Sequence, residues 1–425
     1  MARTIPDAPQ FVDAKRLKPL WMRAINGLGR IFASKHSRFG ASDFWPKAIA
    51  KASRQQTAAP GTQVISEPPA HLKEALGQLT RAVDTEGELN WIGRIAALDD
   101  TLRMAATGLG VEAMHARHPE LAETKISDPI FILGLPRTGT TALHHLLAAD
   151  PANRTIPYWE SFDPVPPPDG ASDRRSEKLE KMLKQLDSLV PEVQAIHPMT
   201  ADLPEECVAF FMNIFRTLQF DIQYKIPGYV DWLLKQDARV AYADYRRQLQ
   251  LIASARPLGK RFVLKDPTHL LHQEAILDLF PDAKFIFIHR APEQSISSIC
   301  SLYAYTRAIF VDHVAPQSIG QEIMSGYWAD ALDGAFEGHR ARLAPERIID
   351  VRQADLVANP LDIAERIYSA FSMDWDAVAR AGLGAHLRAQ AATPRARHEH
   401  SLAGFGLREE TVRERFKTYC ERFDV

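Results

Sequence analysis

The sequence predicts an α/β fold with a central parallel sheet. Four short apolar runs, rich in β-branched or aromatic residues, are typical of buried strands and lie at 129–135, 261–265, 284–289 and 347–352. Helical patterns separate these runs, and strands that alternate with helices favour a parallel sheet covered on both faces. A glycine-containing turn after the first run leads directly into a helix, an arrangement that binds anions.

The bulk properties exclude several classes of protein. The chain has 425 residues, with 51 basic and 53 acidic side chains and a net charge of −2, which gives no reason to expect nucleic acid binding. Its three cysteines lie far apart without CxxC spacing, so we expect reduced thiols and neither a disulfide framework nor a zinc site. No window approaches the roughly 18 apolar residues of a membrane span, and the first residues lack the apolar core of a signal peptide. We therefore expect a cytoplasmic protein with no integral membrane segment.

The chain divides into a helical extension and a main domain. Residues 1–125 are expected to pack on the core formed by 126–425. Within the extension, apolar residues recur at three- and four-residue spacing across 68–120, which predicts helices that could support a homodimer. In the main domain, RTIPYWE (154–160) is interpreted as a further short strand. The block 173–256 is predicted to be helical and to cap the carboxyl edge of the sheet.

The turn after the first strand carries a phosphate-binding pattern. Residues 134–141 read GLPRTGTT, which has the G-x4-G spacing of a Walker A loop, although Thr140 stands where a nucleotide kinase has lysine. The backbone N–H groups of 137–141 would form a concave anion site at the start of a helix. Arg137 supplies the positive charge of the missing lysine. The remaining ligands of this loop are expected to be Thr138, Gly139, Thr140 and Thr141.

A second phosphate site is predicted directly after the apolar run at 284–289. The run FIFIHR ends in Arg290, and Ser298 follows eight residues later on a helix that Pro292 begins. The guanidinium and the hydroxyl can grip one phosphate together. No acid suited to holding Mg²⁺ follows an apolar strand, since those strands end in Lys265-Asp266 and in His289-Arg290. We therefore expect no metal.

These motifs resemble those of the sulfotransferases that use 3′-phosphoadenosine 5′-phosphosulfate (PAPS). LGLPRTGTTAL resembles the family's 5′-phosphosulfate loop, in the arginine-containing form of the bacterial small-molecule branch, and Arg290 with Ser298 resembles its 3′-phosphate site. The resemblance covers roughly 128–425. It implies a P-loop-type three-layer fold with a large helical cap, extended here by extra N-terminal helices. It also implies sulfuryl transfer from PAPS to a small hydroxyl acceptor. A late basic loop closes over the 3′-phosphate in the family, and the candidates for that loop here are Arg395, Arg397, His398, His400 and Ser401.

The acceptor is expected to bind against the helical block. That block contains a dense aromatic set, most of it expected in the core and some of it in the acceptor cleft: Phe210, Phe211, Phe215, Phe220, Tyr224, Tyr229 and Trp232. The set favours an apolar or aromatic alcohol over a sugar.

The reaction needs a base for the acceptor proton and cations beside the leaving phosphate. Lys265, at the end of its strand, is expected to act as a second cation beside Arg137. Three positions compete for the base: the pair Glu205 and Glu206, His269, and Glu160. Asp202 and Glu205 have the spacing of a capping box, which gives Glu205 a structural alternative. His197 is a minor candidate.

Two other functions remain open at this stage. An ATP-dependent P-loop kinase would depend on Mg²⁺ and would not need a 3′-phosphate on its nucleotide. A non-catalytic nucleotide-binding protein of the same fold would bind 3′-phosphoadenosine 5′-phosphate (PAP) without turnover. The absent lysine and the second phosphate site both count against the kinase.

Overall fold

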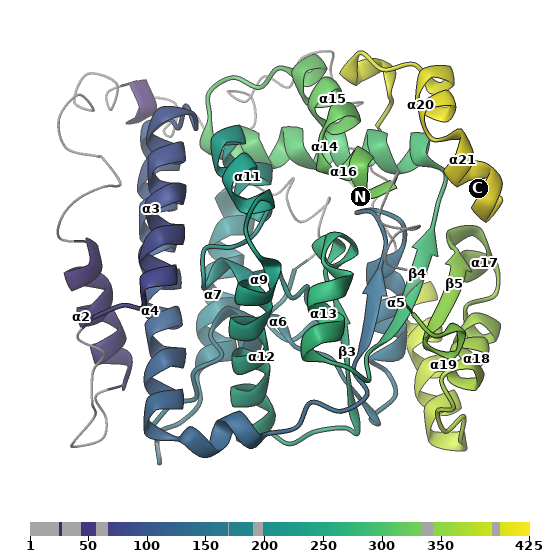
Figure 1. Cartoon of the computed structure of the whole chain (residues 1–425), viewed down its shortest axis with the longest axis horizontal. Coiled ribbons are helices and arrows are strands. Elements are labelled where there is room, and N and C mark those ends of the chain that lie inside the picture. The colour runs from purple at the N-terminus through teal and green to yellow at the C-terminus, as the bar shows by residue number, and fades with distance from the viewer. Residues whose placement is uncertain are drawn as a thin grey trace.

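A five-stranded sheet forms the centre of the molecule (Figure 1). The computed structural model describes residues 25–27, 44–56, 67–168, 170–189, 199–332, 343–392 and 400–425. The strand order is β2-β3-β1-β4-β5, and every pairing is parallel. The strands are β1 (Ile130–Leu133), β2 (Asn153–Arg154), β3 (Arg261–Lys265), β4 (Lys284–His289) and β5 (Ile348–Arg352).

Helices cover both faces of this sheet. Phe131 and Leu133 of β1 pack on the face covered by α12 (Ala238–Ala255), α13 (Gln273–Leu279) and α14 (Pro292–Phe310). Ile130 and Ile132 pack on the opposite face, against α5 (Thr140–Leu147), α18 (Pro360–Ala370) and α19 (Ala377–Ala391). Figure 1 shows the strands between these two helical layers. The predicted three-layer α/β fold is therefore confirmed.

The sheet order brings three strand ends together. β1 lies between β3 and β4, with Ile132 beside Lys265 and Leu133 beside Phe287. Because all three strands run in the same direction, the residues that follow them meet at one edge. The crevice beyond the carboxyl ends of such strands, where the connections diverge to opposite sides, is the usual ligand position in parallel sheets.

The predicted strand at 154–160 is largely wrong. Only Asn153 and Arg154 pair with β3, and residues Tyr158–Phe162 form the short helix α6. Pro157 ends the extended segment, since it has no N–H for a strand ladder and stands directly before the helix. Glu160 therefore lies in a helix.

The remaining helices belong mainly to the two ends of the chain and to the block between β2 and β3. Where the structure describes it, the block is mainly helical, as predicted, and contains α7 (Arg175–Leu189), α9 (Val208–Met212), α10 (Gln219–Tyr224), α11 (Pro227–Leu234) and α12. The other helices are α2 (Phe44–Gln56), α3 (Ala70–Thr85), α4 (Trp91–Arg117), α15 (Pro316–Ser325), α16 (Tyr327–Asp330), α17 (Gln353–Ala358), α20 (Glu409–Arg415) and α21 (Lys417–Phe423). Short 3₁₀ turns are η1 (Pro119–Glu123), η2 (Pro267–Leu271), η5 (Pro345–Arg347) and η6 (Ala403–Phe405). In the part of the chain described here, no helix is both long and apolar enough to cross a membrane.

The aromatic set of the helical block is packed in the interior. Phe210 and Phe211 belong to the cluster beneath the sheet. The other five pack against α3 and α4, around Leu79 and Met104. Six of the seven side chains are buried and Trp232 is partly buried, so this packing does not support the expectation that some of them line an acceptor cleft.

An ion pair ties α3 to α12. His71 Nε2 lies 2.8 Å from Asp244 Oδ2, with Glu112 and Arg247 close by. The contact with Asp244 raises the pKa of His71 above its ordinary value near 6.5, against the opposing effect of burial. A group with a raised folded-state pKa stabilises the fold fully below its unfolded pKa and loses that effect as pH rises through the folded pKa.

His71→Gln is therefore expected to destabilise the protein more at pH 5.5 than at pH 9. The expected difference is about 0.5 kcal/mol at the lower pH, as for a partly exposed ion pair, and close to zero at the higher pH. Urea unfolding of both proteins at the two pH values measures it. A deficit that stays the same or grows with pH would contradict the assignment.

Candidate active site

The turn between β1 and α5 requires glycine at two positions. A Cβ on Gly134 would lie 2.8 Å from Ile288 O, and Gly139 has a φ of +98°. Between them, Arg137 adopts a φ of +69°, which residues other than glycine rarely do. Strained backbone of this kind concentrates at binding sites. Here it stands directly before the first N–H groups of α5, which favour a bound anion.

Arg137 joins the two predicted phosphate sites. Its Nε donates to Ser298 Oγ over 3.2 Å. In turn, a terminal nitrogen of Arg290 donates to the carbonyl oxygen of Arg137 over 2.5 Å. The remaining nitrogens of Arg290 donate to Gln294 Oε1 over 3.2 and 3.1 Å. The loop after β1 and the unit formed by β4 and α14 therefore make a single site.

The two arginines form a cationic pair. Burial lowers the pKa of Arg137 and of Arg290, and the positive charge of Arg137 lowers that of Arg290 further. Two partly buried cations repel one another, and an anion placed between them stabilises the charged form of both. This electrostatic arrangement, together with the helix start, is suited to phosphate groups.

Lys265 links this anion site to a carboxylate. It ends β3 and is 1% exposed. Its Nζ donates to Thr141 Oγ1 over 3.1 Å and forms an ion pair with Glu206 Oε1. The negative charge of Glu206 also acts on Arg137, where it partly offsets the lowering of the pKa by burial. The structure therefore brings together Arg137, Thr141, Lys265 and Glu206.

A second carboxyl group, that of Asp266, belongs to the residue directly after Lys265. Asp266 is 1% exposed, and its Oδ1 accepts from the N–H and the hydroxyl of Thr268 over 2.8 and 2.6 Å. Burial raises the pKa of Asp266 to about 7, with a further contribution from the charge of Glu206.

Three hydrogen bonds place the segment that carries Glu206. Cys207 N donates to Lys265 O over 2.9 Å, and Glu205 N donates to Ile156 O over 3.0 Å. His145, one helical turn after Thr141, contacts Pro204 O through Nε2 at 3.1 Å. Glu206 is thus held between the ends of β3 and α5.

A model of the sulfotransferase family matches residues 129–377, which is more than half of the chain and includes both phosphate-binding units. The chain belongs to the sulfotransferase family. The family predicted from the loop and from the Arg290 unit is therefore confirmed.

Mycobacterial sulfotransferases are among its relatives. An omega-hydroxy-beta-dihydromenaquinone-9 sulfotransferase of Mycobacterium bovis is 28% identical over 288 residues, which are 64% of this chain and 70% of the relative. The crystal structure of sulfotransferase STF1 from Mycobacterium tuberculosis is 29% identical, with a TM-score of 0.72, 90% of this chain covered and all of the other. The structure of STF9 from Mycobacterium avium is 27% identical, with a TM-score of 0.79 and coverage of 92% and 98%.

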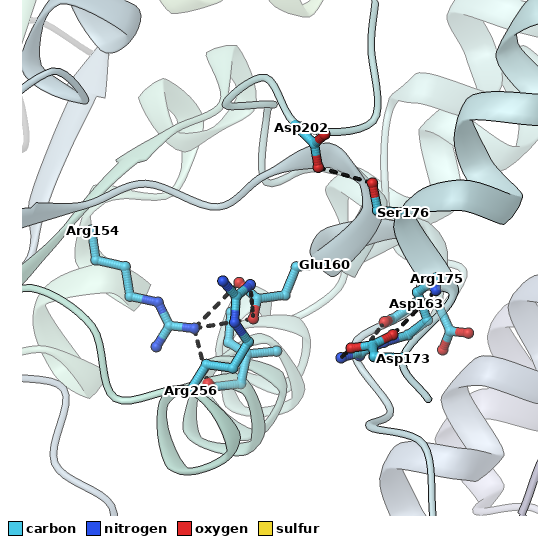
Figure 2. Close-up of polar contacts among 9 residues, drawn as sticks. Arg154, Glu160, Asp163, Asp173, Arg175, Ser176, Asp202 and Arg256 are labelled. Atoms are coloured by element: carbon cyan, nitrogen blue, oxygen red, sulfur yellow. Dashed lines mark hydrogen bonds and ion pairs between the residues drawn. The ribbon is translucent and has the colours of Figure 1, made fainter. Parts of the chain in front are cut away.

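Glu160 of this sulfotransferase is buried and forms ion pairs with two arginines. Figure 2 shows it between Arg154 and Arg256. It is 1% exposed, and both of its oxygens accept from Arg154 over 3.2 Å. Arg256 approaches to 3.5 Å. A buried carboxylate paired with the buried Arg154 and the partly exposed Arg256 has the contacts of a structural element, so the geometry does not favour Glu160 as the base.

His269 is also buried in the interior. It has no exposed surface, and its ring packs against Phe131 and Phe211 with centroids 5.1 and 5.8 Å away. Its Nδ1 lies 2.6 Å from the hydroxyl of Tyr242. Burial lowers the pKa of the imidazole well below its usual range. A ring enclosed in this way has no exposed surface for an acceptor, so this geometry favours Glu206 over His269 as the candidate base.

The predicted capping box at Glu205 is absent. Helix α9 begins at Val208, and Asp202 instead accepts from Ser176 Oγ over 2.9 Å (Figure 2). Glu205 Oε1 accepts from the backbone N–H of Glu206 over 2.9 Å. Of the two neighbouring acids, only Glu206 forms the ion pair with Lys265.

The other predicted ligands lie at different depths. Thr138 is buried and donates to Leu135 O over 2.8 Å, so its hydroxyl holds the turn together. Thr140 is buried at the start of α5, whereas Thr141 is exposed. Of the late basic segment, Arg395, Arg397 and His398 lie outside the described residues, as does His197. His400 is described, and its Nδ1 lies 2.9 Å from Ser297 Oγ.

Proposed function

We propose that this sulfotransferase transfers a sulfuryl group from PAPS to a hydroxyl group. The observation that carries the proposal is the contact between the two phosphate-binding units, in which Arg137 bonds to Ser298 and Arg290 bonds to the carbonyl of Arg137. PAPS has a phosphosulfate at the 5′ position and a phosphate at the 3′ position, so it can engage both units. ATP has no 3′-phosphate and would leave one unit without its anion.

The proposed roles follow the position of each group. Arg290 and Ser298 hold the 3′-phosphate, while Arg137 and the N–H groups at the start of α5 hold the 5′-phosphate. Thr138 and Gly139 shape the loop, and Thr140 and Thr141 contribute hydroxyl groups. The late residues Arg397 and His398 remain predicted ligands of the 3′-phosphate. His400, which follows them closely in the sequence, contacts Ser297 on α14.

The reaction proceeds as an in-line displacement at sulfur. The acceptor oxygen attacks sulfur and forms the new S–O bond, while the bond from sulfur to the bridging 5′-phosphate oxygen breaks. Glu206 takes the acceptor proton. Lys265 and Arg137 stabilise the negative charge that develops on the departing PAP. Lys265 suits this role because it contacts both Thr141 of the phosphate loop and Glu206.

For the acceptor we propose a small-molecule alcohol or phenol. The mycobacterial relative, whose name specifies an omega-hydroxy menaquinone, supports a hydroxyl acceptor. The aromatic set no longer supports an apolar acceptor, since those side chains pack in the core clusters. The proposal of an apolar acceptor therefore depends on this relative.

Calorimetric titration with PAP, ADP and ATP tests the donor. PAP is expected to bind at least tenfold more tightly than ADP, which corresponds to about 1.4 kcal/mol. Binding without added Mg²⁺ is expected as well. PAP affinity equal to that of ADP would rule out the assignment of Arg290 and Ser298, and Mg²⁺-dependent transfer from ATP would establish the kinase instead.

A further inference from the structure

The C-terminal helices pack beside the turn between β4 and α14, which contains Arg290. Figure 1 shows α20 and α21 beside the carboxyl end of β4 and the first part of α14. Arg413 of α20 donates to Glu293 Oε1 through Nε and a terminal nitrogen, over 3.0 and 2.6 Å. Glu293 lies in the first turn of α14, between Arg290 and Ser298. More than a hundred residues of chain separate these partners, so the contact is purely tertiary.

A chain of hydrogen bonds leads from this end of the molecule to Arg290. His289, directly before it, is buried, with Nε2 at 2.8 Å from Asp350 Oδ1 and Nδ1 at 3.2 Å from the hydroxyl of Tyr419. The same hydroxyl also hydrogen-bonds the backbone of Arg290. Burial raises the pKa of this phenol, and the Arg290 contact opposes that rise, as an N–H donor to the phenol oxygen does.

The directions of these bonds are mutually consistent. Because the Tyr419 oxygen accepts from Arg290 N–H, its own proton is available for His289 Nδ1. His289 Nε2–H is then the donor to the carboxylate of Asp350. The ring of His289 also stacks on Phe423, with centroids 3.7 Å apart and planes 10° apart. Each polar group of this chain is thus satisfied in one arrangement, which restricts the backbone at Arg290.

We propose that Tyr419 is a positioning residue for the donor, which orients Arg290 from the C-terminal helix so that its guanidinium meets the 3′-phosphate. The inference rests on the proposed function. Because this chain of hydrogen bonds ends at Arg290, its loss is expected to act on the 3′-phosphate that Arg290 binds.

Tyr419→Phe tests this role, because it removes the hydroxyl and keeps the ring that packs 5.1 Å from Phe423. The variant is expected to bind PAP about five- to tenfold more weakly, the effect of one lost hydrogen bond. KM for PAPS rises in parallel, kcat stays within twofold, and the affinity for ADP, which lacks the 3′-phosphate, is unchanged. Asp350→Asn, which alters the far end of the chain, shifts PAP affinity in the same direction by a smaller factor.

Tyr368→Phe provides the matched control. Tyr368 is also buried and donates to Asp150 Oδ2 over 2.5 Å, but it lies on α18, on the other face of the sheet. This variant is expected to lose stability with the ratio of PAP to ADP affinity unchanged. The proposal is overturned if Tyr419→Phe binds PAP like the wild type, or if its PAP and ADP affinities fall equally. Failure of the wild type itself to prefer PAP over ADP would instead refute the proposed function.

Discussion

Replacing Glu206 with glutamine is expected to lower kcat by about 10²- to 10⁴-fold, the usual contribution of a general base. This corresponds to about 2.7–5.5 kcal/mol of transition-state stabilisation. The amide keeps the size of the side chain but cannot accept the acceptor proton. It also removes the negative charge paired with Lys265. The affinity for PAP is expected to change by less than threefold, because Arg137, Arg290 and the N–H groups at the start of α5, which hold the phosphates, are unchanged.

The measurement is the rate of PAP formation with the best acceptor from a panel of alcohols and phenols, together with PAP affinity by calorimetry. Glu205→Gln is the matched control, since the two acids are neighbours and only Glu206 forms the ion pair. Its kcat is expected to fall by less than tenfold. Glu160→Gln should lower thermal stability through the loss of its pairing with Arg154. A large rate loss in Glu205→Gln combined with near-normal turnover in Glu206→Gln would reverse the assignment.

The strands of the sheet were predictable because their environment is simple. β3 and β4 are buried on both faces, so apolar residues fill them without interruption and their bounds match the predicted runs 261–265 and 284–289. β2 was mispredicted because it contains only two paired residues. The end of β2 depends on Pro157, which is visible in the sequence, and on pairing with β3, which a local sequence pattern does not reveal.

The phosphate-binding half of the site was predictable because its motifs are local. Arg137 lies within a short loop, and Arg290 and Ser298 lie eight residues apart on one strand and helix. The contact between the two units depends on the position of β1 beside β4, which no spacing within either motif specifies.

The catalytic half was less predictable because its partners come from distant segments. Glu206 and Lys265 are 59 residues apart, and their contact follows from the bond between Cys207 N and Lys265 O. Likewise, the sequence around Glu160 does not predict its contact with Arg256, which directly follows α12. His145 and Tyr419 were not identified from the sequence at all. One supports a backbone carbonyl and the other a backbone N–H, so neither belongs to a recognisable side-chain motif.

The two arginines are expected to separate binding from chemistry. Arg290→Ala should weaken PAP binding by about 10- to 100-fold, the effect of losing charge-assisted hydrogen bonds, with kcat close to that of the wild type at saturating PAPS. Arg137→Ala should weaken binding similarly and also lower kcat by about 10²- to 10³-fold. The difference arises because only Arg137 lies at the phosphate that leaves, where charge develops in the transition state.

The backbone of Arg137 requires its own control. Its φ of +69° is strained for alanine, so Arg137→Ala could lose activity through a distorted loop rather than a missing guanidinium. Arg137→Gly removes the same side chain and accommodates this conformation without strain. If the guanidinium acts on the leaving group, both variants lose kcat to the same extent, and Arg290→Ala loses affinity alone. Unchanged turnover in Arg137→Gly would show instead that the loop amides and Lys265 carry the developing charge without Arg137.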